Sequence, residues 1–199
     1  MKQAGRIWNR MMNEAMILWG FIHLSTESCV YYQSQLSRII MTMVHIDDFL
    51  AIVSLKEENG LFKEDMQKIW TISDLEDASF CVGIAIKWDH IQNTVHLSQT
   101  ALIDRIVVQF GQKDSYSTTM PIDLGLKLQH PDKTSMSSSD KFELNCLPYQ
   151  SLVGSLIYIS IGTHPDITYA VQQLSQFLDS YSFTHWNAAV CIVRYLKGT

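Results

Sequence analysis

Two adjacent aspartates, Asp47 and Asp48, are the side chains of this sequence whose type and spacing most clearly suggest chemistry. Apolar, strand-like runs flank them at residues 38–46 and 49–54. Neighbouring residues of a regular strand point to opposite faces, so both carboxylates can serve one site only at the tip of a tight hairpin. Two acids held close repel each other unless a cation neutralises them, and carboxylate oxygens suit Mg²⁺. The pair therefore predicts a Mg²⁺ site for phosphoryl or nucleotidyl transfer.

The same pair has a plainer interpretation as an acidic turn. Aspartate is common in turns, and the two residues taken alone favour that structural role over a metal site. An unrelated Mg²⁺ phosphatase would need a nucleophilic aspartate or a glycine-rich phosphate loop, and the sequence shows neither pattern. The four cysteines lie far apart and form no CxxC motif, so a zinc site is not expected.

The elements that must position the aspartates are predicted from the spacing of apolar residues. Helical spacing covers 2–19, 58–70 and 100–110, and strand-like runs cover 29–33, 38–46, 49–53, 79–88 and 94–97. The first helix should pack on the sheet through Trp8, Met12, Ala15 and Trp19, and Gly20 should end it. The spacing of Phe80 and Trp88 predicts that both belong to the strand core.

A change of composition divides the sequence. Residues 129–145 are rich in serine and poor in large apolar residues, which predicts a solvated linker. Helical patterns follow at 149–161, 165–178 and 183–196, with Thr163 as the expected cap of the second and Pro165 in its first turn. We therefore expect a mixed domain over 1–128, a linker over 129–148 and a helical segment over 149–199.

The overall composition is that of a folded chain with an acidic balance. It has 199 residues, 47% hydrophobic and 18% charged, with a net charge of −5. This total gives no general signal for nucleic-acid binding, although Lys2, Arg6 and Arg10 could form a small basic patch on one helix. The dispersed cysteines fit a reducing compartment, and no secretion signal or membrane span is expected. We therefore expect an intracellular, cytoplasmic protein that is not secreted.

The surroundings of the aspartates resemble those of copia-type LTR-retrotransposon reverse transcriptases. His45-Ile46-Asp47-Asp48 is similar to the Tyr-Val-Asp-Asp box of that family. Further segments resemble family motifs in the same order along the chain: 2–9, 20–21, 29–31, 80–86 ("FLGIEI" in the family), 97–99 ("LSQ"), 149–158, 163–167 ("TRPDI") and 186–199. The matches cover nearly the whole sequence, which makes the resemblance specific.

The resemblance implies a fold and a set of site residues. The fold would be α+β, a polymerase palm-like antiparallel sheet with packed helices, followed by a helical connection. Asp47 would be the principal Mg²⁺ ligand and Asp48 the second carboxylate. A primer-grip hairpin would contain Phe80, Val82, Gly83 and Ile84, and Lys2, Gln3 and Arg6 would lie near the template and incoming nucleotide.

The resemblance also implies an activity and its partners. The activity would be RNA-directed DNA polymerisation by two-metal nucleotidyl transfer. The partners would be a primer–template of RNA or DNA, a dNTP and the rest of a retrotransposon polyprotein, inside a cytoplasmic virus-like particle and without a membrane.

Several departures from the family pattern shape these expectations. His45 replaces the usual Tyr, Gly5 a Pro, Glu76 a Gly and His164 an Arg. The family carries another catalytic aspartate on a strand before the Lys2-Gln3 segment, and its ribonuclease H follows the segment that ends here at Thr199. Neither is part of these 199 residues. We therefore expect a polyprotein fragment that is inactive alone, or alternatively a non-catalytic remnant that binds nucleic acid or a partner.

Overall fold

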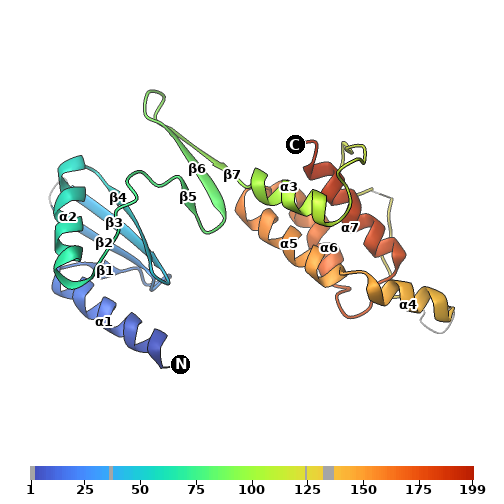
Figure 1. Cartoon of the computed structure of the whole chain (residues 1–199), viewed down its shortest axis with the longest axis horizontal. Coiled ribbons are helices and arrows are strands. Elements are labelled where there is room, and N and C mark those ends of the chain that lie inside the picture. Colours follow the sequence, from blue (N-terminus) through green and yellow to red (C-terminus); the bar gives the residue numbers. More distant parts are fainter. Residues whose placement is uncertain (1–2, 36–37, 124, 132–136) are drawn as a thin grey trace. The chain divides into compact units, whose positions relative to one another are not determined.

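The chain folds into two compact units, residues 1–78 and 79–199 (Figure 1). The computed structural model describes residues 3–35, 38–123, 125–131 and 137–199. Both units combine antiparallel sheets with helices, which confirms the predicted α+β class. No helix among the described residues is long and apolar enough to cross a membrane.

The first unit is a four-stranded antiparallel meander with two helices. The sheet has the order β1-β2-β3-β4, and its strands span Ile22–His23, Val30–Gln35, Arg38–His45 and Asp48–Val53. Helix α1 spans Ala4–Leu18 before the sheet, and α2 spans Lys56–Ile69 after it. Strand β4 is hydrogen-bonded only to β3 within the described sheet, so it forms one of its edges.

Helix α1 packs through a face close to the predicted one. Met12 and Ala15 are buried as expected, and Met16 joins them. Trp8 and Trp19 are only half-buried. Gly20 ends the helix with φ of +82°, and the bonds from Gly20 N to Ile17 O and from Phe21 N to Met16 O form a Schellman motif.

One apolar core holds both helices against the sheet. Met12 and Met16 of α1 and Phe62 and Met66 of α2 contact the same buried cluster, together with Phe21, Tyr31 and Val44. Tyr31 and Val44 come from neighbouring strands, and the register places them on one face of the sheet. Both helices therefore cover that face and fix the position of the β3–β4 hairpin.

The second unit begins with a three-stranded antiparallel sheet and continues with helices. Strands β5, β6 and β7 span Phe80–Cys81, Ile84–Asp89 and Thr94–Ser98. The helices are α3 (Thr100–Gln109), α4 (Ser138–Cys146), α5 (Tyr149–Gly162), the short 3₁₀ helix η1 (Pro165–Ile167), α6 (Thr168–Ser175) and α7 (Phe183–Leu196). The predicted helix over 165–178 is thus a 3₁₀ turn followed by a shorter α-helix.

Helix α5 is central to the core of this unit. Leu152, Val153, Leu156 and Ile159 have no exposed surface. Side chains of α3, α6 and α7 pack against them, including Ile106, Leu174 and Ile192. Because α3 shares this core, the structure groups residues 79–128 with the helical tail, whereas the sequence predicted a division near residue 128.

The predicted linker over 129–148 contains a helix, α4, most of whose residues are exposed. Ser137 caps α4 by accepting a hydrogen bond from Asp140 N at 3.1 Å. Leu144 is buried, and Tyr181 Oη donates to Leu144 O at 2.9 Å and Leu147 O at 3.0 Å. One buried leucine and a distant tyrosine therefore order a segment whose composition alone looks like a loop.

Candidate active site

The two aspartates lie at the end of the β3–β4 hairpin. The last ladder pair is His45 and Asp48, so Ile46 and Asp47 form a two-residue loop. Ile46 has φ of +57°, which gives the hairpin the left-handed first loop residue of a type II′ turn. The predicted hairpin is confirmed: Asp47 is at its tip and Asp48 is the first residue of β4.

The turn is strained at Ile46. A left-handed backbone is unusual for a β-branched residue and costs about 1–3 kcal/mol. Such a conformation persists only where neighbouring groups hold it. The side chain of Ile46 is 72% exposed, so its own burial does not hold the turn.

A tryptophan from α1 supports the strained turn. Trp8 Nε1 donates a hydrogen bond to Ile46 O at 3.0 Å. The Trp8 ring meets Trp70 edge-on, with the ring centroids 5.5 Å apart. Trp70, at the end of α2, also contacts Trp19 and Phe49 at 5.8 Å and 6.2 Å. The aromatic cluster of Trp8, Trp19, Phe49 and Trp70 therefore connects both helices to the hairpin.

Sequence reasoning placed Trp8 in the apolar face of α1 but missed its hydrogen bond. The available signal was general: a tryptophan carries an N–H that usually finds a partner when the ring is buried. The identity of that partner depends on the hairpin, 38 residues away along the chain.

The carboxylates of Asp47 and Asp48 face solvent. His45, Ile46 and both aspartates are all exposed. No group of three or more His, Cys, Asp or Glu side chains that could hold a metal occurs within the described residues. Mg²⁺ usually keeps several waters and takes one or two protein carboxylates together with substrate phosphates. The donor chemistry of the turn therefore fits Mg²⁺ bound jointly with a nucleotide, and fits a site for the metal alone poorly.

The N-terminal part of α1 carries polar and basic residues. Gln3, Arg6, Ile7 and Arg10 line a shallow hollow of about 200 Å³. Trp8, from the same two turns of helix, reaches the aspartate turn, so this part of α1 lies beside the hairpin. Lys2 lies outside the described residues. A role of Gln3 and Arg6 near a template or nucleotide stays a prediction.

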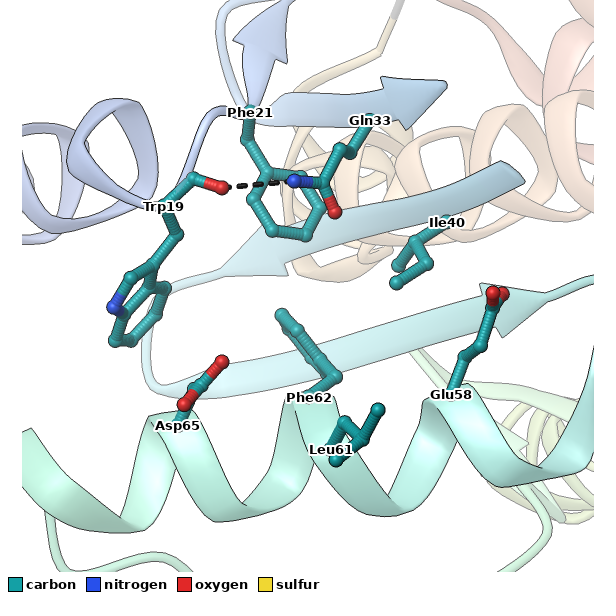
Figure 2. Close-up of a pocket in the computed structure, with 8 residues that line it drawn as sticks. All are labelled: Trp19, Phe21, Gln33, Ile40, Glu58, Leu61, Phe62 and Asp65. Atoms are coloured by element: carbon teal, nitrogen blue, oxygen red, sulfur yellow. Dashed lines mark hydrogen bonds between the residues drawn. The ribbon is translucent and has the colours of Figure 1, made fainter. Parts of the chain in front are cut away.

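A second hollow lies between the sheet and α2 (Figure 2). It measures about 190 Å³ and is lined by Trp19, Phe21, Gln33, Ile40, Glu58, Leu61, Phe62 and Asp65. Gln33 Nε2 donates to Trp19 O at 2.8 Å across its upper wall, as the close-up shows. Neither Asp47 nor Asp48 lines this hollow, so it is a feature of helix packing and separate from the acidic turn.

The predicted primer-grip residues form a second tight hairpin, in the other unit. Phe80 and Cys81 pair with Ala85 and Ile84, which leaves Val82 and Gly83 as the loop. The expectation that Phe80 and Trp88 belong to the strand core was wrong, because they are 64% and 43% exposed. The three-stranded sheet buries little of its own apolar surface, and the spacing of residues along a strand does not reveal this.

A family model matches the part of the chain that contains the acidic turn. The family model described as reverse transcriptase (RNA-dependent DNA polymerase) matches residues 1–124. The chain belongs to the reverse transcriptase family. Its relatives include the retrovirus-related Pol polyprotein from transposon TNT 1-94 of Nicotiana tabacum, 30% identical over this whole chain. The Pol polyprotein from transposon RE2 of Arabidopsis thaliana is 28% identical, and the putative transposon Ty5-1 protein of Saccharomyces cerevisiae is 25% identical, again over the whole chain.

This reverse transcriptase chain is short compared with those relatives. It spans 15% of the tobacco polyprotein, 13% of the Arabidopsis polyprotein and 62% of the yeast protein. No solved structure matches the chain.

Several family-like motifs of this reverse transcriptase chain have structural roles. Gln99 is 2% exposed, and its Oε1 accepts a hydrogen bond from Thr163 Oγ1 at 2.9 Å. Thr163, expected as a helix cap, thus joins the start of α3 to the end of α5. Lys197 Nζ donates to the carbonyls of Gln112, Lys113 and Ser115 at 3.3, 2.5 and 2.7 Å. These motifs hold the second unit together.

Proposed function

We propose that the chain is the part of a copia-type retrotransposon RNA-directed DNA polymerase that carries two carboxylates of its Mg²⁺ site, Asp47 and Asp48. The observation that supports this proposal best is the strained, exposed turn that presents both residues. An ordinary acidic turn needs neither a left-handed isoleucine nor an indole hydrogen bond to its backbone. Strain retained in this way is typical of functional turns.

The residues of the turn have distinct roles in this proposal. Asp47 and Asp48 would hold Mg²⁺ when it binds together with a dNTP. Trp8 fixes the backbone of the turn so that the carboxylates need little rearrangement on binding. Bound Mg²⁺ would activate the primer 3′-hydroxyl and neutralise charge on the leaving pyrophosphate. The exposed Arg6 and Gln3, on the helix that carries Trp8, would attract the nucleotide or template phosphates.

A further carboxylate should lie beside β4. In the described sheet β4 is an edge strand and begins with Asp48. A strand paired to its free edge could bring an aspartate next to the turn, as the resemblance to the family implies. We further propose that the natural context is a cytoplasmic polyprotein particle, with a primer–template and dNTPs as partners.

The proposal predicts an activity that depends on this added strand. The 199-residue chain alone should show no incorporation of labelled dNTP on a primed RNA template with Mg²⁺, because Asp47 and Asp48 come from a single turn and cannot surround two ions. A chain with a fused aspartate-bearing strand from a related polymerase should incorporate dNTP. Asp47→Asn should abolish that activity, whereas Asp104→Asn, which changes an exposed aspartate of α3, should not. Activity that survives Asp47→Asn would refute the assigned site.

A second candidate is a non-catalytic module that binds nucleic acid. The exposed Gln3, Arg6 and Arg10, which line one hollow on α1, support it for the isolated chain. A salt-dependent mobility shift of a primer–template duplex, without incorporation by either the chain or the fused protein, would favour this alternative.

A further inference from the structure

The β5–β6 turn has a backbone that its own residues do not favour. Val82 and Gly83 have φ of +46° and +74°, the pair of positive values typical of a type I′ turn. Glycine adopts this conformation freely, but a β-branched valine does so only where the surroundings hold it. The Val82 side chain is 43% exposed, so its burial does not provide that support.

A tyrosine from α5 contacts this turn. Tyr158 Oη donates a hydrogen bond to Val82 O. The carbonyl of a loop residue is not used by the ladder of a two-residue hairpin, so it is available for such a partner. A Cβ on Gly83 would lie 2.9 Å from the same hydroxyl oxygen, closer than side chains normally approach. Glycine at position 83 therefore suits both the positive φ of the turn and the nearby tyrosine hydroxyl.

Helix α5 is a rigid base for this contact. Leu156 and Ile159, on either side of Tyr158 in the sequence, have no exposed surface, whereas Tyr158 is 41% exposed. The end of the same helix also contacts the segment between β7 and α3, where Thr163 donates a hydrogen bond to Gln99. In Figure 1 the end of the β5–β6 hairpin lies beside the last turns of α5.

We propose that Tyr158 is a positioning residue that locks the β5–β6 turn onto α5, and that a primer end is held by the turn in this locked position. The second part rests on the proposed function. The hydroxyl carries the effect: it restrains the Val82 carbonyl, and it lies where a Cβ at position 83 would meet it.

Hydrogen exchange of the whole chain tests the contact. The amide of Ile86 donates to Ser79 O at 2.8 Å and reports whether the hairpin is closed. In Tyr158→Phe this amide should exchange about fivefold faster, as expected for the loss of one hydrogen bond, while the amides of α3 keep their rates. Tyr169→Phe removes the hydroxyl of a tyrosine that is 66% exposed on α6, and it should leave the Ile86 rate unchanged.

A second pair of variants tests whether the hydroxyl and Gly83 are coupled. Gly83→Ala should speed Ile86 exchange strongly in the unsubstituted chain. It should do so several-fold less in the Tyr158→Phe background, because the atom that the new Cβ would meet is gone. Equal effects of Gly83→Ala in both backgrounds, or no effect of Tyr158→Phe on Ile86, would overturn the inference.

Affinity for a primer–template duplex, measured by mobility shift, tests the role of the turn. Tyr158→Phe should weaken binding about fivefold, with no change for Tyr169→Phe. Faster exchange combined with unchanged affinity would overturn the role in holding a primer. If neither the unsubstituted chain nor the fused protein binds the duplex, the proposed function fails, and the exchange experiment still decides the contact between Tyr158 and the turn.

Discussion

Trp8 should contribute to stability in two separable ways, by its hydrogen bond and by its ring. The indole N–H bonds to Ile46 O at 3.0 Å, and the ring contacts Trp70. Trp8→Phe removes the bond and keeps most of the ring, so it should lower the free energy of unfolding by about 1 kcal/mol. For a fully buried tryptophan, substitution by alanine would lower the free energy of unfolding by about 3–5 kcal/mol. Because the Trp8 ring is half-buried and its hydrogen bond is also lost, Trp8→Ala should lower it by about 3 kcal/mol.

Urea unfolding followed by circular dichroism at 222 nm measures both changes without relying on tryptophan fluorescence. Leu18→Ala is the matched control, because Leu18 belongs to the same helix and is 82% exposed. It should change the free energy of unfolding by less than about 0.5 kcal/mol. If both Trp8 variants behaved like Leu18→Ala, the turn would not depend on α1, and Trp8 would not stabilise the strained backbone of Ile46.

Three further perturbations address other parts of the structure. Ile46→Gly should raise the free energy of unfolding by about 1 kcal/mol in urea, because glycine tolerates the left-handed turn; a loss of stability would contradict the strain. Burial, and secondarily His130, lowers the pKa of His185. The free energy of unfolding should therefore fall as the pH drops below about 6.5, where the unfolded chain takes up the proton. His185→Phe should weaken this pH dependence, and identical profiles of stability against pH for the two chains would refute the role of His185. Gln99→Ala should lower the free energy of unfolding, measured in urea, by about 2 kcal/mol, whereas Gln172→Ala, at an exposed position, should hardly change it. Equal changes would show that the bond between Gln99 and Thr163 contributes little to stability.

The local elements and the reverse transcriptase family could be predicted from the sequence. The apolar runs around Asp47 and Asp48 predicted the hairpin, because alternating and periodic patterns report which faces of an element are buried. The helices over 4–18, 56–69 and 149–162 followed from the same periodicity. The motif order gave the family, and the match to residues 1–124 confirmed it.

The exposure of single side chains was less predictable. Phe80 and Trp88 have strand spacing, yet they are 64% and 43% exposed because the three-stranded sheet covers little of its own surface. The helix over 138–146 was missed because its order depends on one buried leucine and on Tyr181, a residue far along the chain. Periodicity within a short segment carries no information about such distant partners.

The sequence by itself determined where the acidic turn, the helices and the family motifs lie, since these depend on neighbouring residues. Only the tertiary structure decided what supports each turn. The bond from Trp8 to Ile46 spans 38 residues, and the bond from Tyr158 to Val82 spans 76. Each joins a side chain to the backbone carbonyl of a residue with positive φ. Every residue carries such a carbonyl, so the sequence does not indicate which one accepts the bond. Such contacts exist only once the helices and hairpins have packed together, so the sequence pattern cannot display them.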